Sequence, residues 1–258
     1  MDIFQTIILG IVEGITEFLP VSSTGHLAIV AQWLGISKDT FLPSFNIAIQ
    51  LGAILAAVVL YAEKLLTERA LWGRIAIAFL PTAVVGVTLY KFIRSLLDSA
   101  WIAAIALFLG GVIMIIVEKI LAKKKDIEPM EEDSMPTMRQ SLYIGLYQVL
   151  AFVPGISRSA ATIIGGMVHK VSRRTAVEFS FLLAIPTMIA ATGYDLFRNG
   201  AAFAASDWYV LLVGGVVAFI TALFAMKWLL AYVKKYTFIP FGIYRMVLTL
   251  AFVLVLFF

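Results

Sequence analysis

Six long apolar stretches constrain the fold of this chain more than any other feature. A helix that crosses a bilayer needs about 20 mostly apolar residues, and the six stretches cover residues 45–62, 75–92, 101–121, 176–196, 208–230 and 241–258. Because 62% of the residues are hydrophobic and only 14% are charged, no polar stretch is long enough to form a water-soluble domain. The sequence therefore predicts a single all-α integral membrane domain over residues 1–258.

Two further apolar regions are interrupted by turn-forming residues. Residues 3–34 are broken at "FLPVSSTGH" and residues 141–168 at "FVPGISRSA". Proline ends a helix because it has no N–H group, and serine accepts hydrogen bonds from the free amides of a helix start. Each region therefore predicts a re-entrant hairpin with a polar tip. Such irregular backbone is tolerated at membrane depth only where protein buries it or where it lines a wet cavity.

The chain also contains an internal repeat. Pro20 and Pro154 are 134 residues apart, as are Ser23 and Ser157, and "FNIAIQLGAILAA" matches "FSFLLAIPTMIAA" at the same offset. If each half is a hairpin followed by three crossings, the second half starts on the opposite side of the membrane. The sequence thus predicts an inverted-topology repeat, with a first repeat over 1–121, a cytoplasmic linker over 122–138 and a second repeat over 139–258.

The basic residues predict the orientation of this repeat. On the predicted topology one side holds fourteen basic residues and the other holds only Lys38, Lys91, Arg94 and Arg198. By the positive-inside rule the richer side, which includes Lys123, Lys124 and Lys125, is cytoplasmic. Both termini and the mouth of the first hairpin then face outward. The second hairpin enters from the cytoplasm, and the two tips meet near the midplane.

Glu13 and Glu17 are the acidic candidates in the first hairpin. On a helix, residues four apart are neighbours on one face, and two buried carboxylates repel each other unless a proton or a cation lies between them. Oxygen ligands next to a phosphorylated substrate suit Mg²⁺ or Ca²⁺. We therefore expect a divalent cation at this pair. The structural alternative is that both are acids at a helix N-terminus or at a contact between helices.

Hydroxyls and a guanidinium mark the two hairpin tips as an anion site. Ser22, Ser23 and Thr24 open the second helix of the first hairpin, and "PGISRS" opens its counterpart with Ser157, Arg158 and Ser159. Free helix-start amides, hydroxyls and arginine bind phosphate; the alternative for the serines is simple N-capping. Thr162, in the same helix, and Gln50, in an apolar span, are further candidate substrate contacts.

His26 follows Ser23 by three residues, which places both on one helical face. That spacing suits a nucleophile and its base, although a lone histidine in apolar sequence can also be structural. The sequence leaves three nucleophiles open: Ser23, His26 or a water molecule. Arg245 lies in the last apolar span, where it could line the cavity or balance charge between helices. Cysteine is absent, which excludes disulfides and cysteine nucleophiles.

The motifs "EGITEFLPVSSTGH", "QVLAFVPGISRSAATI" and "EFSFLLAIP" together closely resemble the undecaprenyl pyrophosphate phosphatase family of bacteria, also known for bacitracin resistance. The resemblance spans essentially the whole chain. It implies a multi-pass enzyme of the bacterial plasma membrane that removes the terminal phosphate of a C55 polyprenyl diphosphate at the outer face, recycling the lipid carrier of cell-wall synthesis. One departure is Ala160, where the family usually has glycine.

The resemblance also implies roles for individual residues. Ser23, His26, Glu17 and Arg158 would be catalytic, and Glu13 with Glu17 would hold the metal. The implied partners are the polyprenyl diphosphate and the bilayer, and no nucleic acid is expected. The sequence does not decide whether the protein forms a homodimer. The rival hypothesis is a secondary transporter or flippase of a phosphorylated lipid, because inverted repeats with broken helices and a midplane site are also transporter architecture. The clustering of acids, hydroxyls, histidine and arginine favours the enzyme.

Overall fold

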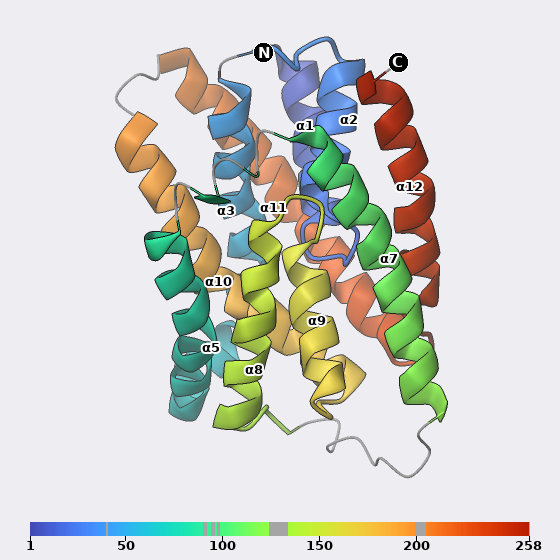
Figure 1. Ribbon diagram of the computed structural model, residues 1–258. Helices are drawn as coiled ribbons and strands as arrows, with labels where there is room; N and C mark the ends of the chain where they lie inside the picture. The colour runs from blue at the N-terminus through green and yellow to red at the C-terminus, as the bar shows by residue number, and fades with distance from the viewer. Residues whose placement is uncertain are drawn as a thin grey trace.

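The computed structural model describes residues 1–39, 41–89, 92, 93, 96, 99–123, 134–199 and 205–257. Every element in these ranges is a helix (Figure 1). Most of the predicted linker 122–138, including Lys124 and Lys125, lies outside the described residues. The elements are α1 (Ile3–Thr16), α2 (Ser23–Trp33), α3 (Leu42–Leu60), α4 (Ala62–Thr67), α5 (Arg69–Thr88), α7 (Ala100–Lys123), α8 (Met138–Val149), the 3₁₀ turn η1 (Leu150–Phe152), α9 (Arg158–Val168), α10 (Arg173–Asn199), α11 (Ala205–Val233) and α12 (Ile239–Phe257).

Five of the described helices are long and apolar enough to cross a membrane: α3, α5, α7, α10 and α11. They coincide with five of the six predicted spans, and the all-α membrane class is confirmed. The sixth predicted span corresponds to α12, of which the stretch Ile239–Val255 counts among the shorter apolar helices of the described residues. The helices also extend past the apolar stretches. α5, for example, starts at Arg69 rather than near Ile75, because a helix can continue into the polar interface.

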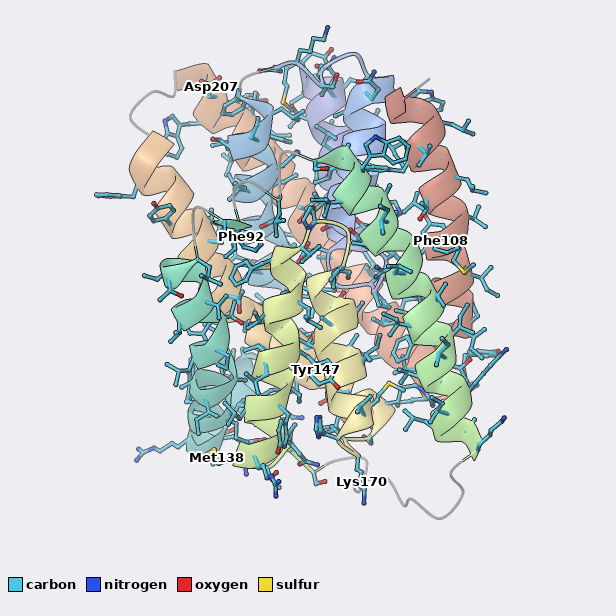
Figure 2. All side chains as sticks on the ribbon, in the orientation of Figure 1. Phe92, Phe108, Met138, Tyr147, Lys170 and Asp207 are labelled. Atoms are coloured by element: carbon cyan, nitrogen blue, oxygen red, sulfur yellow. The ribbon has the colours of Figure 1, made fainter. Side chains whose placement is uncertain are left out.

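The two interrupted regions form pairs of short helices. α1 has 14 residues, α8 has 12, and α2 and α9 have 11 each, so each is shorter than a bilayer crossing requires. In Figure 1 the turn of each pair lies between the two ends of the bundle, and the pairs enter from opposite ends. Both chain termini lie at one end. Met138 and Lys170 lie at the other end in Figure 2, opposite Asp207.

The two helix pairs match each other in local detail. α1 begins with a capping box between Asp2 and Gln5, and α8 begins with one between Thr137 and Gln140. The residues that precede α2 and α9, Ser22 and Ser157, both have a left-handed backbone, with φ of 71° and 70°. The corresponding residues, Asp2 and Thr137, Gln5 and Gln140, and Ser22 and Ser157, are each 135 residues apart. The predicted pairing of Ser23 with Ser157 at an offset of 134 is therefore wrong by one residue within the hairpins.

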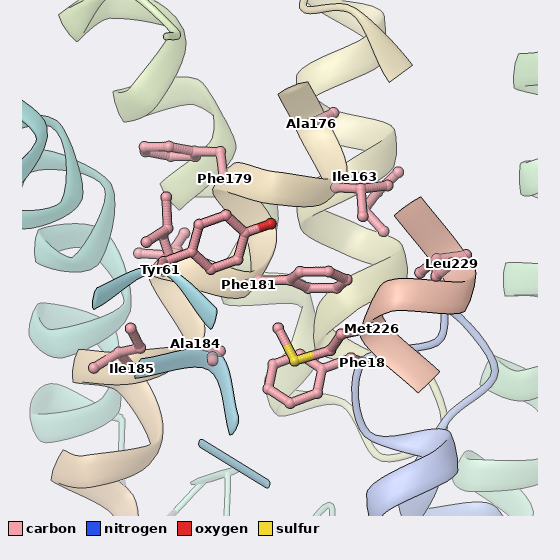
Figure 3. Close-up of a cluster of buried hydrophobic side chains, with 14 of the residues drawn as sticks. Phe18, Tyr61, Ile163, Ala176, Phe179, Phe181, Ala184, Ile185, Met226 and Leu229 are labelled. Atoms are coloured by element: carbon pink, nitrogen blue, oxygen red, sulfur yellow. The ribbon is translucent and has the colours of Figure 1, made fainter. Parts of the chain in front are cut away.

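A buried aromatic cluster packs under the first tip (Figure 3). Phe18, in the turn after α1, meets Phe181 of α10 edge to face with ring centroids 5.1 Å apart. Tyr61 and Met226 belong to the same cluster. Because Phe18 follows Glu17 in the first tip and Phe181 follows Ser180 in α10, this packing holds the backbone next to Glu17 and next to Ser180. Close packing of this kind holds membrane helices together, since lipid supplies little hydrophobic drive between them.

Candidate active site

The tips of the two hairpins touch each other. Ser159 of α9 donates a hydrogen bond from its hydroxyl to the Leu19 carbonyl in the first tip, at 2.8 Å. Arg245 of α12 donates from Nη1 to the carbonyls of Pro20 in the first tip and Ile156 in the second, at 3.3 and 3.0 Å. Residues about 140 positions apart in the chain thus form one continuous surface.

A polar cavity of about 160 Å³ lies at this junction. Its walls combine the beginnings of α2 and α9 and the second tip with Glu17, which follows α1, and with one residue each from α3 and α10. The polar side chains that line it are Glu17, Ser22, Ser23, Thr24, Gln50, Ser157 and Arg158. Helix starts present free amides and the positive end of the helix dipole, so the cavity favours an anion. Seven of the residues that the sequence singled out therefore share one cavity.

The left-handed serines make this convergence of helix starts possible. Ser22 and Ser157 adopt φ values that residues other than glycine seldom take. Such a conformation costs about 1–3 kcal/mol and persists only where the surrounding structure enforces it. Ser157 also caps α9 by accepting a hydrogen bond from the Ala160 amide at 3.3 Å. Ser22 makes no such side-chain cap. The capping interpretation thus holds for one serine and leaves the Ser22 hydroxyl at the cavity.

Glu17 is the centre of the hydrogen-bond network. Its Oε2 accepts a 2.6 Å hydrogen bond from the Ser23 hydroxyl, and its Oε1 accepts one from Nη2 of Arg158 at 3.3 Å. Nη1 of Arg158 donates to the Ser180 carbonyl at 2.8 Å, which fixes the plane of the guanidinium. The ion pair is almost fully buried and joins the two hairpins. Removing one partner would leave an uncompensated buried charge, which typically costs about 3–5 kcal/mol.

Glu13 lies one helical turn before Glu17 and is completely buried. Neither of its carboxylate oxygens has a hydrogen-bond partner among the described residues. An ionised carboxylate cannot stay buried without compensation, so Glu13 needs either a proton or a cation. Its two free oxygens fit Mg²⁺ or Ca²⁺. The described residues contain no cluster of three or more acidic, histidine or cysteine side chains, so further ligands would come from substrate and water.

The structure does not pair His26 with Ser23. His26 Nδ1 lies 2.8 Å from the Ser22 carbonyl, and Nε2 lies 2.7 Å from the Tyr244 hydroxyl of α12. A carbonyl can only accept, so Nδ1 carries the proton and the neutral ring accepts from Tyr244 through Nε2. The two rings also stack, with centroids 5.6 Å apart. Glu17 takes the Ser23 hydroxyl instead, because a carboxylate is the stronger acceptor.

Ser159 and Thr162 are buried beneath the cavity and are absent from its lining. The Ser159 hydroxyl lies 3.1 Å from the Ser157 hydroxyl in addition to its bond across the tips. The Thr162 hydroxyl lies 2.7 Å from the Ser180 hydroxyl. In this structure both hydroxyls bond to residues that line the cavity or hold Arg158 in place, and direct contact with substrate stays a prediction for both.

Sequence reasoning missed two contributors to the site, Tyr244 and Ser180, and assigned a third, Arg245, the wrong role. Tyr244 holds His26, and Ser180 orients Arg158 through its carbonyl. Arg245 is fully buried, and its four hydrogen bonds within the described residues all go to backbone carbonyls, those of Leu107, Pro20, Ile156 and Gly155. It neither lines the cavity nor balances an acid, so both predicted roles for Arg245 are wrong. A buried ionisable residue in an apolar span was the available signal.

Known proteins match nearly the whole length of this chain. The family model described as bacitracin resistance protein BacA matches residues 6–251. An undecaprenyl-diphosphatase of Wolinella succinogenes is 47% identical over 252 residues, which cover 98% of this chain and 97% of the relative. Those of Aquifex aeolicus and of a Sulfurihydrogenibium species are 46% and 50% identical, each over at least 96% of both chains. The chain therefore belongs to the bacitracin resistance protein BacA family.

Proposed function

We propose that this protein is a membrane phosphatase that hydrolyses undecaprenyl diphosphate to undecaprenyl phosphate and inorganic phosphate. The relatives with this printed name match nearly the whole chain. The observation that carries the proposal is the buried series of hydrogen bonds from Ser23 to Glu17 and from Arg158 to Glu17. All three side chains line the cavity at which α2 and α9 begin. They combine a hydroxyl nucleophile, a base and a phosphate-binding cation within one cavity.

In this mechanism Ser23 is the nucleophile and Glu17 is its base. The Ser23 Oγ attacks the terminal phosphorus while its proton passes to Glu17 Oε2, which already accepts it at 2.6 Å. The bond from phosphorus to the bridging oxygen breaks, and undecaprenyl phosphate leaves as the anion. Water then attacks the phosphoserine, and Glu17 returns the proton to Oγ as inorganic phosphate leaves. The Ser23 hydroxyl and the Glu17 carboxylate are thereby regenerated.

Arg158 supplies the positive charge of the site. A guanidinium binds two phosphate oxygens at once and stabilises the charge of the transferring phosphoryl group. Its second anchor on the Ser180 carbonyl keeps it in place when a diphosphate competes for Nη2. The neighbouring hydroxyls of Ser22, Thr24 and Ser157 and the amide of Gln50 face the same cavity and would complete the shell around the phosphates.

His26 has a positioning role in this proposal. Its Nδ1–H group holds the Ser22 carbonyl, and Ser22 is the left-handed residue that precedes the nucleophile. Trapping with phosphate-labelled substrate and peptide mapping tests the assignment. We expect label on Ser23. Label on His26 would make the histidine the nucleophile, and a failure to trap any phosphopeptide during active turnover would favour direct attack by water.

A divalent cation, Mg²⁺ or Ca²⁺, is part of the proposal. Glu13, with help from Glu17, would hold it, and the bound ion would offset the charge of the diphosphate and polarise the bridging oxygen. The support is the pair of unpartnered oxygens on Glu13. In the presence of methylenediphosphonate, Mg²⁺ should raise the melting temperature of the wild type and not that of Glu13→Gln. An equal rise in both proteins would exclude Glu13 as a ligand.

We further propose that the two hairpins are re-entrant parts of an inverted repeat, with the cavity open to the outer face of the inner membrane. The short helices, the turns between the two ends of the bundle, the opposite directions of entry and the matching caps support the repeat. The excess of basic residues on the predicted cytoplasmic side supports the orientation. A cysteine at position 124 should be unreactive to impermeant reagents outside intact cells; reactivity there would reverse the orientation.

The decisive test of the activity uses purified protein in detergent, where no transport can occur. We expect the wild type to release phosphate from undecaprenyl diphosphate and Ser23→Ala to release almost none. Thr67→Ala is a suitable control because, among the described residues, its hydroxyl bonds only to the Glu63 carbonyl within its own helix. If the wild type releases no phosphate from any polyprenyl diphosphate, the transporter or flippase hypothesis replaces this proposal.

A further inference from the structure

A second cavity, larger and almost wholly apolar, lies beside the polar one. This groove of about 400 Å³ is bounded by α7, by the end of α8 and by the start of α9. α7 contributes Ile105, Ala106, Leu109 and Ile113, and the hairpin contributes Leu150 and Ala160 among others. α7 runs beside α9 in the fold (Figure 1). The phosphatase mechanism above does not use the groove.

The shape of the groove follows from the order of large and small residues on α7. Ile105, Leu109 and Ile113 are four apart, so they share one helical face, and Ala106 stands next to them with a side chain too small to fill the space. The three large side chains are 56%, 50% and 51% exposed. α7 is one of the membrane-crossing candidates. The groove therefore opens sideways, toward the lipid.

The groove adjoins the phosphate site directly. Val153 lines both cavities, Gly155 lines the polar one, and Ile156 lines the groove. The tip of the second hairpin is thus a thin partition with a polar face and an apolar face. A molecule with a diphosphate at the helix starts and an apolar chain attached to it could occupy both spaces around this tip.

We propose that the groove binds the first isoprene units of the prenyl chain, and that α7 thereby orients the diphosphate for attack by Ser23. The proposal rests on the phosphatase function. Moving a prenyl chain from lipid into an apolar groove yields little hydrophobic free energy. The advantage is orientation: a chain held beside the tip restricts the diphosphate to a reactive position, and such restriction accelerates reactions strongly. The groove thus makes chain length a determinant of rate.

The test compares a C15 prenyl diphosphate with the C5 isopentenyl diphosphate in the same detergent. Ala106→Phe should fill the groove. The ratio of kcat/KM for the C15 substrate to kcat/KM for the C5 substrate should then fall at least tenfold. Ala251→Phe is the matched control, because Ala251 is an exposed residue of α12 that lines neither cavity; its ratio should equal that of the wild type. An unchanged ratio in folded Ala106→Phe would overturn the proposal that the groove binds the prenyl chain, and it would leave the proposed phosphatase function intact. Absence of hydrolysis of any polyprenyl diphosphate by the wild type would instead refute the function.

A labelling experiment on the wild type needs no variant to fold. A prenyl diphosphate with a benzophenone on its third isoprene unit should crosslink to peptides containing Ile105, Leu109 or Leu150, and excess unlabelled farnesyl diphosphate should suppress the crosslink. Two results would overturn the proposal. One is labelling confined to other helices, and the other is groove labelling that only added phospholipid suppresses, which would identify the occupant as an ordinary bilayer chain.

Discussion

The α1–α2 hairpin and the α8–α9 hairpin have similar backbone conformations but carry different side chains. At an offset of 135 residues, Glu13 corresponds to Gln148, Glu17 to Phe152, Ser23 to Arg158 and His26 to Ala161. Gln148 is satisfied by neutral partners: it donates to the Thr82 hydroxyl at 2.8 Å and accepts from the Thr187 hydroxyl at 3.4 Å. Glu13 has no such partners.

This difference shows how two similar helix pairs can build an asymmetric site. The shared turn brings two helix starts together, which attract an anion without regard to side chains. The first hairpin adds the acids and the hydroxyl, whereas the second adds the guanidinium. Neither hairpin alone contains both a base and a phosphate clamp. In the proposed mechanism the reaction depends on contact between the tips, and the following variants test that dependence.

The largest effect is expected for Glu17→Gln, which removes the base from the first hairpin and the charge partner of Arg158. General-base catalysis contributes about 10²–10⁴-fold, so we expect kcat for phosphate release to fall about a thousandfold. Glu178→Gln is the control: Glu178 is also largely buried and ion-paired, to Lys64 and Arg174, but lies outside the cavity. Similar rates for the two variants would show that Glu17 is not a specific part of the reaction.

Arg245→Lys should have an intermediate effect, because it loosens the contact between the tips. A single ammonium group cannot reach all four carbonyls that the guanidinium binds, and each buried acceptor left free costs about 1–3 kcal/mol. We expect a fall in kcat of about tenfold, a lower melting temperature and little change in KM. Arg245→Met should be worse than Arg245→Lys on every measure. Equal kcat values for Arg245→Lys and the wild type would mean that the tips do not need this clamp.

Tyr244→Phe should have the smallest effect. It removes the hydroxyl that lies 2.7 Å from His26 Nε2 but keeps the stacked ring. One neutral hydrogen bond is worth about 0.5–1.5 kcal/mol, so a fall in kcat of about fivefold is expected, with Nδ1 still on the Ser22 carbonyl. A loss as large as that of Glu17→Gln would indicate that Tyr244 and His26 take part in proton transfer themselves.

Local sequence patterns predicted the residues of the site better than their partners. Glu17, Ser23 and Arg158 could be found because polar residues are conspicuous beside prolines in apolar stretches, and the cavity does unite them. The pairing of His26 with Ser23 failed because helical spacing does not account for a competing carboxylate or for the free carbonyl of a left-handed residue. Arg245 was conspicuous, but its four backbone acceptors lie in three separate segments that only the folded chain brings together.

The central claim is that Arg158 of the second hairpin acts in one site with Glu17 and Ser23 of the first hairpin. One measurement tests this claim most directly. Phosphate release from undecaprenyl diphosphate should be compared for purified wild type and Arg158→Lys in detergent. Lysine keeps the charge but loses the two-pronged geometry, so kcat should fall about a hundredfold while the variant remains folded and monodisperse. A rate close to that of the wild type would contradict the composite site.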